Sequence, residues 1–278
     1  MSRRTEKPFW DPDELQAHLQ THTLGRELIV FNRITSTNDF LKRLARRGAK
    51  EGATILADEQ TAGRGRLGRK WQSPAGKGLW FSFLLRPQLP LDKIGVLSLA
   101  IAALIAETLT QQCGKDFRVK WPNDVLFGGK KVCGILCETQ MSPTNVEAVI
   151  AGVGINVLQT EDDLAVEWRG RATSLFAAGC ANLDRKNIFA ALLSAFEKNL
   201  MGEISPRLPR LVAQWCARCE GLGEPITVLP ASMSGLQSES TSGIFESLGE
   251  GGELIVRLPS GGLRFFSAGE ITIARNMT

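Results

Sequence analysis

Residues 61–71 read TAGRGRLGRKW, and the stretches on either side of them decide the fold class. Their three glycines have the spacing G-x-G-x-x-G, a pattern that in phosphate-binding folds joins a strand to a helix. The flanking stretches 53–58 (ATILAD) and 79–86 (LWFSFLLR) are both typical of strands. A strand therefore follows the loop, and no GKS or GKT closes it as in a Walker A sequence. The sequence predicts a strand–loop–strand unit and neither of these phosphate-binding turns.

Strands and helices mix along the chain as far as Glu220, which predicts an α+β domain with a mixed β-sheet flanked by helices. The expected strands are 27–33, 53–58, 79–86, 117–121, 131–140 and 146–157. The expected helices are 37–47, 95–112, 185–201 and 206–220. Ser36 or Thr37 can cap the first helix, and Gly48 suits the position after its end. The helix at 95–112 is apolar nearly all round, so we expect it to be buried.

The composition changes near Gly221. From there on, short alternating stretches (EPITVL, GIFESL, ELIVRL and LRFFSA) are separated by Gly, Ser and Pro. Strands at this spacing, with turn signals between them, predict a small all-β barrel. We therefore expect three parts: an N-terminal extension at 1–26, the α+β domain at 27–220 and a β module at 221–278.

Positive charge is concentrated in the quoted loop. The chain has 33 Lys and Arg against 29 Asp and Glu, a formal net charge of +4. Arg64, Arg66, Arg69 and Lys70 equal this whole excess, so the remaining residues balance to zero. A charge this local favours a small anionic ligand over a polyanion that follows a broad basic face.

The overall composition is that of an ordinary globular protein, with 43% hydrophobic residues. No apolar run approaches the ~18–20 residues that a membrane span needs. The first residues, MSRRTEKPFWDPDEL, lack the apolar region of a signal peptide. We therefore expect a cytoplasmic protein without a membrane partner.

Cysteine and histidine usage argues against metal binding and nucleophilic catalysis. In a cytoplasmic protein the six cysteines are expected to be thiols. Cys216 and Cys219 form a C-x-x-C pair, but no second pair stands at zinc spacing. His18 and His22, the only histidines, stand four residues apart on an expected short helix, and we assign them surface or packing roles and no metal. With two histidines, a Ser-His-Asp or Cys-His mechanism has little to work with, which favours electrostatic catalysis.

The loop at 61–71 has the composition of an anion cradle. Glycines let successive N–H groups converge on an anion, and arginines add charge with bidentate geometry. A solvated basic loop is the plain alternative. An RNA-binding arginine–glycine segment is a weaker one, because the loop is short and has no interleaved aromatic residues.

Three further segments carry polar groups at places that suit a ligand site. ITSTND (34–39) can either cap a helix or hold a polar uncharged group. VKWPNDVLFGGKKVCGI (119–135) continues from a strand through a Gly-Gly hairpin to Lys131. The alternative for this segment is an ordinary hairpin in which Asp124 bonds backbone amides. AGVGINV (151–157) allows close backbone approach and places Asn156 among apolar residues.

In this order, ITSTND, DEQTAGRGRLGRKWQSP, KWPNDV…KKVCGIL and AGVGINV resemble the biotin protein ligase family. The resemblance covers roughly residues 27–278, and GRGRLGRKW matches the family's specific GRGRxGRxW segment. The β-rich tail is similar to the family's small SH3-like C-terminal domain, and Glu270-Ile271 in AGEITI matches its closing motif. Family members of the repressor type carry an N-terminal winged helix. About 26 residues precede the first expected strand here, so we expect the monofunctional type, without a DNA-binding domain and without specific DNA binding.

The resemblance implies a two-step, ATP-dependent ligase. Biotin's carboxylate attacks the α-phosphate of MgATP and gives biotinyl-5′-AMP and pyrophosphate. The ε-amine of a specific lysine on a biotin carboxyl carrier protein then attacks this mixed anhydride. Biotin and ATP are thus the substrates, Mg²⁺ accompanies ATP, and the ligase is a monomer or a homodimer. Because a carboxylate must approach a triphosphate, positioned cations and amides suffice and no protein nucleophile is needed.

The resemblance also assigns residues to three overlapping sets. The biotin-binding set is Ser36, Thr37, Asn38, Gln60, Gly63, Arg64, Gly65, Arg66, Lys131 and Gly134. The ATP-binding set is Arg66, Arg69, Trp71, Lys131, Asn156 and Trp168. The catalytic set is Arg64, Arg66, Lys131 and Asp124. In this hypothesis Asp124 orients or deprotonates the acceptor lysine, and Trp168 covers the adenine, with simple packing as the alternative for Trp168.

Two other functions stay open at this point. A lipoate or octanoate ligase would need a linear apolar tunnel where the polar residues at 36–38 and Gln60 stand. A non-catalytic ligand-sensing or nucleic-acid-binding module is disfavoured, because the chain has no basic face outside the loop. An acyl-adenylate must be covered against water, so we expect residues 63–70 to form a lid that is mobile without ligand and ordered over biotinyl-AMP.

Overall fold

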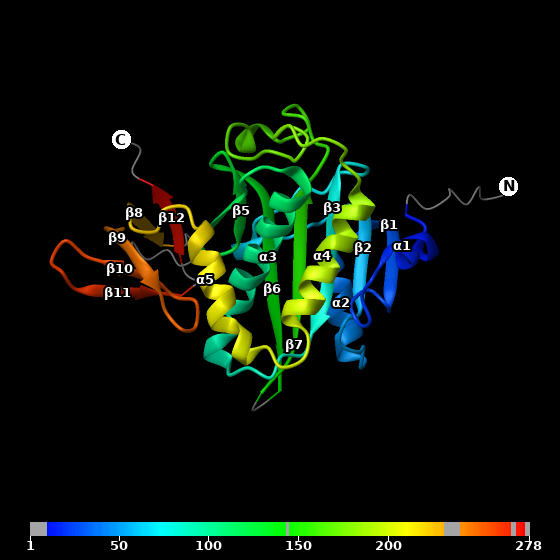
Figure 1. Cartoon of the computed structure of the whole chain (residues 1–278), viewed down its shortest axis with the longest axis horizontal. Coiled ribbons are helices and arrows are strands. Elements are labelled where there is room, and N and C mark those ends of the chain that lie inside the picture. The colour runs from blue at the N-terminus through cyan, green and yellow to red at the C-terminus, as the bar shows by residue number, and fades with distance from the viewer. Residues whose placement is uncertain (1–9, 143–144, 231–239, 268–270, 276–278) are drawn as a thin grey trace.

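A computed structural model describes residues 10–142, 145–230, 240–267 and 271–275 (Figure 1). The helices are α1 (Pro12–His18), α2 (Thr37–Arg46), α3 (Val96–Cys113), α4 (Arg185–Leu200) and α5 (Leu208–Arg218). The strands are β1 (Leu28–Ile34), β2 (Thr54–Gln60), β3 (Gly78–Leu85), β4 (Arg118–Lys120), β5 (Asp124–Phe127), β6 (Lys130–Met141), β7 (Val146–Asn156), β8 (Pro225–Pro230), β9 (Thr241–Leu248), β10 (Leu254–Arg257), β11 (Leu263–Phe266) and β12 (Ile271–Arg275). Short 3₁₀ helices are η1 (Arg66–Gly68), η2 (Leu91–Lys93), η3 (Val166–Trp168) and η4 (Ser205–Arg207).

The predicted mixed sheet with flanking helices is confirmed. The larger sheet has the order β1-β2-β3-β7-β6-β5-β4. β1 and β2 are parallel, and the other neighbouring strands are antiparallel. β2 and β3 pair with Ala57 opposite Trp80, so the glycine–arginine loop joins two adjacent antiparallel strands, as its flanks predict.

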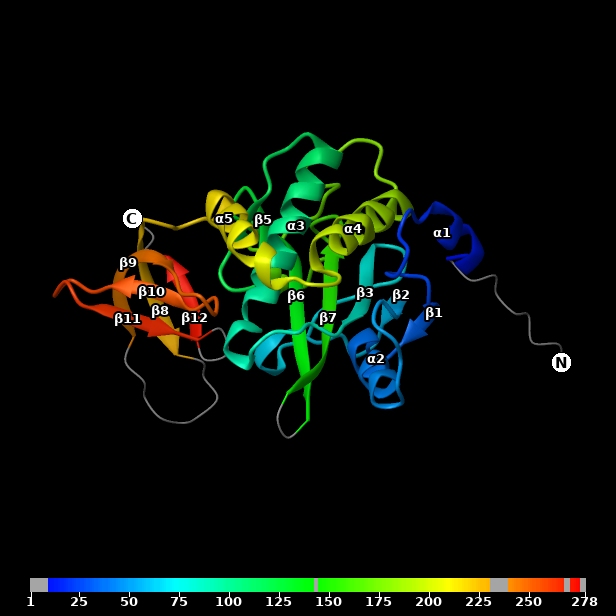
Figure 2. The same cartoon turned by 60° about the horizontal axis from the view of Figure 1, so that its bottom comes forward.

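The predicted small C-terminal β module is also confirmed. Its antiparallel sheet has the order β11-β10-β9-β8-β12 and lies beside α5 (Figure 2). Glu270 of the expected closing motif lies outside the described residues.

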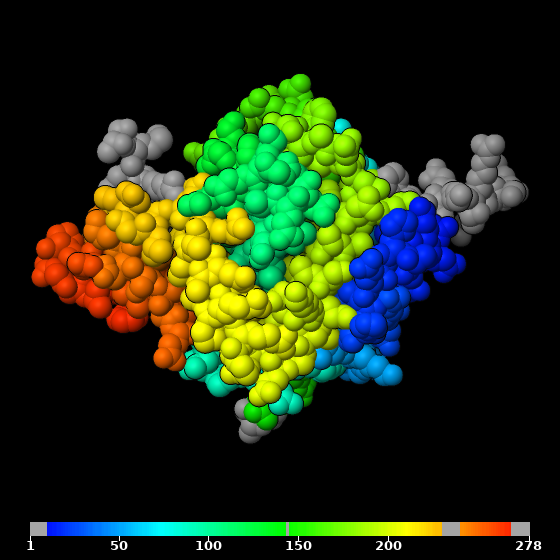
Figure 3. All heavy atoms as spheres, in the orientation of Figure 1, coloured from blue at the N-terminus to red at the C-terminus, as the bar shows by residue number. Residues whose placement is uncertain are grey.

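Helices cover both faces of the larger sheet, because alternate residues of each strand are apolar on opposite faces. On β7, Val149 and Ala151 belong to the main core, which α3 and α4 cover. Their neighbours Ala148 and Ile150 belong to a second, smaller core beneath α2. Figure 3 shows α3, α4 and α5 together on the main-core side, with the N-terminal segment next to α4.

The ITSTND segment forms the N-terminus of α2. Oγ of Ser36 accepts a hydrogen bond from N of Asp39 at 3.3 Å and so caps the helix. Leu41 and Ala45 bury the apolar side of α2 against the sheet. Gly48 follows the helix with φ = +89°, a conformation that favours glycine. The predicted cap and end of this helix are confirmed.

α3 is the buried helix that its composition predicts. Leu91–Cys113, which includes α3, is long and apolar enough to cross a membrane by length and composition alone, and it is the one such segment in the described part of the chain. The expectation that no apolar segment approaches that length was therefore wrong. In this protein 72% of the most apolar 18-residue stretch of this segment is buried, and α3 packs against α4 and α5. Its apolar character on all sides is explained by these contacts.

The N-terminal segment is fixed on α4. The carboxylate of Glu197 accepts hydrogen bonds from N of His22, Thr23 and Leu24 at 2.6, 2.8 and 2.8 Å. α1 ends at His18, because Leu19 takes an extended conformation. The expected pairing of the two histidines on one helix was therefore wrong.

The C-terminal module contacts the turn between β4 and β5 through Trp121. Nε1 of this buried side chain donates to O of Gly252, in the turn between β9 and β10, at 2.9 Å. Nζ of Lys93 also lies 3.2 Å from Oε2 of Glu250 in the same turn. The turn therefore braces the residues that precede Asn123 and Asp124.

We expect Trp121→Phe to destabilise the protein more than Trp215→Phe does. Both changes remove the same atoms from a buried indole, but Nε1 of Trp215 has no hydrogen-bond partner within the described residues. The difference should be about 1–2 kcal/mol, since the carbonyl of Gly252 is left without its donor. Urea unfolding of both variants measures it, and equal losses would show that this hydrogen bond does not hold the module.

Candidate functional site

A cavity of about 810 Å³ opens on the α2 face of the larger sheet, a size typical of small-molecule sites. Its floor follows paired residues of β3, β7 and β6, and paired residues share a face of the sheet. The rows are Trp80–Gly154–Gly134, Ser82–Gly152–Leu136 and Leu84–Ile150–Glu138. In the first two rows β7 carries glycine, so no β7 side chain fills the cavity there. The third row differs, because Leu84 and Ile150 belong to the smaller core beneath α2.

Two of these glycines are required by side chains that cross them. A Cβ on Gly152 would lie 2.1 Å from Oδ1 of Asn38, and one on Gly154 would lie 2.4 Å from Nε1 of Trp71. Both distances are far below van der Waals contact. AGVGINV predicts a close approach to the backbone. In the structure the side chains of Asn38 and Trp71 make this approach, and both line the cavity.

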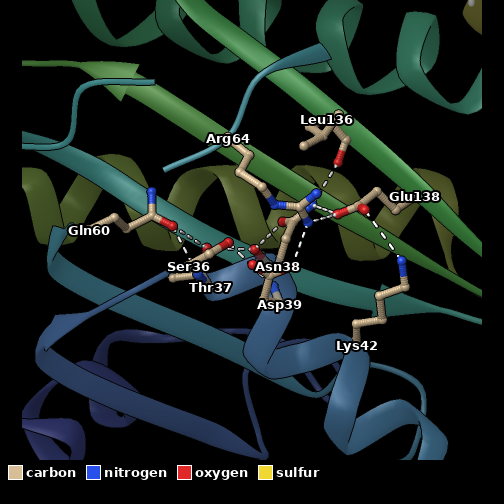
Figure 4. Close-up of polar contacts among 10 residues, drawn as sticks. Ser36, Thr37, Asn38, Asp39, Lys42, Gln60, Arg64, Leu136 and Glu138 are labelled. Carbon is tan, nitrogen blue, oxygen red and sulfur yellow. Dashed lines mark hydrogen bonds and ion pairs between the residues drawn. The ribbon is translucent and has the colours of Figure 1, made fainter. Parts of the chain in front are cut away.

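The end of the cavity between α2 and β2 carries uncharged polar groups (Figure 4). Oε1 of Gln60 accepts from N of Thr37 at 2.8 Å and from Oγ1 of Thr37 at 3.1 Å. Nε2 of Gln60 donates to Oγ of Ser73 at 2.9 Å, and Oγ of Ser82 lies 2.7 Å from Oγ1 of Thr37. Fixed hydroxyl and amide groups of this kind suit a neutral ligand group that has its own N–H and C=O.

Asn38 is buried, and its amide is engaged within the protein. Nδ2 donates to O of Leu136 at 3.2 Å and to Oε2 of Glu138 at 2.9 Å. Oδ1 accepts from Oγ of Ser82 at 2.5 Å. Both amide hydrogens are used in this way, so Asn38 can offer a ligand only an acceptor. Its contacts hold α2 against β3 and β6.

The glycine–arginine loop folds back on itself at the cavity. N of Gly65 donates to O of Arg69 at 2.7 Å, and N of Trp71 donates to O of Gly63 at 2.9 Å. A Cβ on Gly63 would lie 2.4 Å from O of Trp71. Gly63 is thus needed to close the loop and is not among the residues that line the cavity.

Arg66 enters the cavity from this loop. Its Nη1 donates to Oδ1 of Asn123 at 3.2 Å, and Nδ2 of Asn123 donates to O of Ile135 at 2.5 Å. Burial lowers the pKa of Arg66, the charge of Asp124 opposes this, and the charge of Arg69 adds to it. An arginine stays protonated under these conditions. Arg66 therefore presents a half-buried cation whose position is fixed by the KWPND segment.

Lys131 reaches the cavity from the β5–β6 hairpin. Gly128 and Gly129 take φ values of +57° and +76°, as in a type I′ turn, so the predicted hairpin is confirmed. Nζ of Lys131 lies 2.6 Å from Oδ1 of Asp124 and 5.2 Å from the ring centre of Trp71. The carboxylate of Asp124 thus pairs with Lys131, where an ordinary hairpin would have it accept from backbone amides.

The loop after β7 forms another wall of the cavity. N of Ala165 donates to Oε1 of Gln72 at 3.1 Å, which joins this loop to the end of the glycine–arginine loop. Nδ2 of Asn156 donates to O of Thr173 at 3.0 Å. Trp168 stands in η3 and lines the cavity between these two anchor points.

The structure brings the predicted site residues together, apart from Gly63. The predicted residues that line the cavity are Ser36, Thr37, Asn38, Gln60, Arg64, Gly65, Arg66, Arg69, Trp71, Asp124, Lys131, Gly134, Asn156 and Trp168. Lining residues that the sequence analysis did not assign include Lys120, Trp121, Asn123, Gly152, Gly154 and Arg171. The KWPND motif and the alternating glycines of AGVGINV were signals for all of these but Arg171. Which of them contact biotin or ATP stays a prediction.

The chemistry available in the cavity is that of cations, amides and hydroxyls. The described residues contain no group of three or more His, Cys, Asp or Glu side chains that could hold a metal ion. Asp124 is the single carboxylate among the described residues that line the cavity. Burial raises the pKa of Cys137 to about 12 and raises that of Cys133 as well. These thiols stay protonated and are poor nucleophiles.

Comparison with known proteins identifies the family. The model of the biotin/lipoate A/B protein ligase family matches residues 30–156. A biotin–[acetyl-CoA-carboxylase] ligase of Paracoccus denitrificans is 36% identical over 233 residues, which cover 82% of this chain and 93% of that protein. The chain belongs to the biotin protein ligase family. The resemblance predicted from four motifs is thereby confirmed.

Two further matches extend the comparison within the biotin protein ligases. The bifunctional ligase/repressor BirA of Bacillus spizizenii is 38% identical over 210 residues, or 76% of this chain. The chain spans 65% of the length of that relative. The solved biotin protein ligase of Aquifex aeolicus in complex with biotin and ATP is 32% identical, with a TM-score of 0.75. That match covers 90% of this chain and 100% of the Aquifex chain.

Proposed function

We propose that this protein forms biotinyl-5′-AMP from biotin and ATP and transfers the biotinyl group to a lysine of a biotin carboxyl carrier protein. One observation carries the proposal: a single cavity joins the uncharged polar end at Thr37 and Gln60 to the cations Arg66 and Lys131. Biotin has the complementary chemistry, with a neutral ureido ring at one end and a carboxylate at the other. The names of the relatives from Paracoccus and Aquifex support the same activity.

In the first step an oxygen of the biotin carboxylate attacks the α-phosphorus of ATP. The bond from that phosphorus to the oxygen that bridges to the β-phosphate breaks, and pyrophosphate leaves. Both reactants are anions, so the transition state needs positive charge that is already in place. Arg66, fixed by Asn123, and Lys131, fixed by Asp124 and Trp71, supply it.

Mg²⁺ enters this scheme as part of MgATP. It is bound in such sites by substrate phosphates and waters with one or two carboxylates. The triphosphate and waters would supply its ligands here, because the described residues form no group of three His, Cys, Asp or Glu side chains that could hold the ion.

In the second step the acceptor amine attacks the carbonyl carbon of biotinyl-AMP. The bond from that carbon to the phosphate oxygen breaks, AMP leaves, and the nitrogen loses a proton. Asp124 orients the incoming amine and accepts this proton, because it is an acceptor at the cavity wall that faces Lys131. We assign both steps to residues 27–220, and we assign residues 221–278 to an SH3-like module that braces the KWPND segment through Trp121.

A lipoyl or octanoyl group fits the polar end less well. Its linear apolar chain would lie against the hydroxyl and amide groups of Thr37, Gln60 and Ser73 without offering them hydrogen bonds. Biotin is therefore the favoured substrate.

Mass spectrometry of a biotin carboxyl carrier domain tests the function directly. The domain is incubated with this protein and MgATP, with biotin in one sample and lipoate in the other. We expect one biotinyl adduct on one lysine, together with pyrophosphate exchange into ATP that depends on biotin. If exchange depends on lipoate and not on biotin, the assignment to biotin is wrong, although the ligase class survives.

A further inference from the structure

Arg64 belongs to the glycine–arginine loop, but its guanidinium is held by residues outside the loop. Nη2 donates to Oδ1 of Asp39 on α2 and to Oε2 of Glu138 on β6, each at 2.6 Å (Figure 4). These are charge-assisted hydrogen bonds of short length. One nitrogen thus joins the loop to a helix and to a strand at the same time.

Glu138 is itself fixed in place. Nδ2 of Asn38 donates to its Oε2 at 2.9 Å, and Nζ of Lys42 lies 3.4 Å from its Oε1. Burial raises the pKa of Glu138, but the hydrogen bonds from Asn38 and Arg64 and the charges of Arg64 and Lys42 outweigh burial and hold it below its ordinary value. The carboxylate is therefore ionised at neutral pH and available to Arg64.

The surroundings of Arg64 already neutralise its charge. Arg64 and Lys42 carry two positive charges, and Asp39 and Glu138 carry two negative ones, so the cluster sums to zero. Arg66 differs, because its buried Nη2 has no hydrogen-bond partner within the described residues. The two arginines of the GRGR segment thus have different environments, and Arg66 is the one whose buried Nη2 is available to donate a hydrogen bond to an anion.

We infer that Asp39, Arg64 and Glu138 form a tether that holds residues 63–70 over the cavity before any ligand binds. In this reading Arg64 is a positioning residue, which acts by placing the backbone of Gly65 and Arg66. The predicted mobility of residues 63–70 without ligand stays a prediction; in this reading the lid is attached at Arg64 and moves beyond it. What the lid covers rests on the proposed function; the tether itself does not.

The two acids are not equivalent. The side chain of Glu138 is 17% exposed and that of Asp39 is 41% exposed. Water and salt screen an exposed ion pair more than a buried one. Glu138 is therefore the main anchor, and Asp39 is the weaker one.

Hydrogen exchange of the ligand-free protein tests the tether without reference to catalysis. We expect residues 63–70 to exchange about tenfold faster in the Asp39→Asn/Glu138→Gln double variant than in the wild type. Glu138→Gln alone should account for more of the effect than Asp39→Asn alone. Asp39→Glu, which keeps the carboxylate, should retain the protection of the wild-type loop.

Lys42→Met is the matched control, because it removes the other ion pair of Glu138 and Lys42 lies on α2, away from the loop. Its loop exchange should equal that of the wild type. Arg64→Met removes the tether from the other side and should reproduce the double variant, which guards against a folding defect specific to one change. Unchanged exchange in both Arg64→Met and the double variant would overturn the tether.

A second measurement connects the tether to catalysis. With biotin and MgATP and without carrier protein, the double variant should release more free biotinyl-AMP into solution than the wild type, because an untied lid opens more often. Lys42→Met should release the same amount as the wild type. If the wild type forms no biotinyl-AMP at all, the proposed function fails while the exchange result still decides the tether. Equal release by the double variant and the wild type would show that the tether does not serve the lid.

Discussion

Replacing Lys131 with alanine is expected to lower kcat/KM for biotin in the adenylation step about 10²–10³-fold, or roughly 3–4 kcal/mol of transition-state stabilisation. Lys131 stands at the end of a Gly-Gly hairpin, and its side chain is half-buried at the cavity and not in the apolar core. The fold should therefore survive the change. Measurement of biotin-dependent pyrophosphate exchange, with a thermal melt to check folding, gives the result.

Part of this loss should come from the partner that the change leaves behind. Oδ1 of Asp124 lies 2.6 Å from Nζ of Lys131, so Lys131→Ala leaves a carboxylate facing an incoming triphosphate. Asp124→Asn in the same chain removes that repulsion. We expect the double variant to adenylate biotin faster than Lys131→Ala, although still more slowly than the wild type. A double-mutant cycle measures this coupling directly.

Lys130→Ala is the control for this prediction. Lys130 stands beside Lys131 on the same hairpin, but it is exposed and does not line the cavity. Its removal should leave the exchange rate near that of the wild type. If Lys131→Ala keeps an unaltered kcat/KM for biotin, Lys131 has no part in the mechanism.

Much of the fold could be predicted because its determinants are local. Alternation along 146–157 indicates a strand with two apolar faces, and the structure uses both, with Val149 and Ile150 in different cores. The same holds for α2, where Ser36 at one end and Gly48 at the other set the limits of the helix. The local pattern was insufficient where contacts between distant segments determine whether an element is buried. α3 has the composition of a membrane segment, and only its packing against α4 and α5 shows that it is a core helix.

The candidate site shows the same division. The GRGR and KWPND segments each contain several polar groups within a few residues, and the sheet brings the two segments to one cavity. The charge of the loop was evident, but its neutralisation was not. Asp39 and Glu138 are separated from Arg64 by 25 and 74 positions, and no local pattern indicates which arginine they contact. Counting charges in a loop therefore predicts an anion site without showing which of its cations are free to serve it.

Replacing Arg185 with methionine is expected to destabilise the protein by about 3–5 kcal/mol, the usual result of removing one partner from a buried ion pair. Nη1 of Arg185 donates to Oδ1 of Asp58 at 3.1 Å and to O of Gly78 at 3.0 Å, and the side chains of Arg185 and Asp58 are only 6% and 9% exposed. Methionine fills similar space but leaves the carboxylate of Asp58 buried without its cation. The midpoint of thermal unfolding should fall on the order of 10 °C.

Lys186→Met at the next position is the matched control. Lys186 pairs with Glu14, but half of the Glu14 side chain is exposed, and surface pairs contribute about 0–1 kcal/mol. Arg185→Met/Asp58→Asn should recover part of the stability, because no unpaired charge remains.

The Arg185–Asp58 pair also has a consequence for the site. Asp58 accepts hydrogen bonds from N of Gly76 and so fixes the turn that presents Ser73 to Gln60. Arg185→Met should therefore weaken biotin binding even where the protein is still folded, whereas Lys186→Met should change neither property. Equal melting of the two single variants would show that Asp58 does not depend on Arg185.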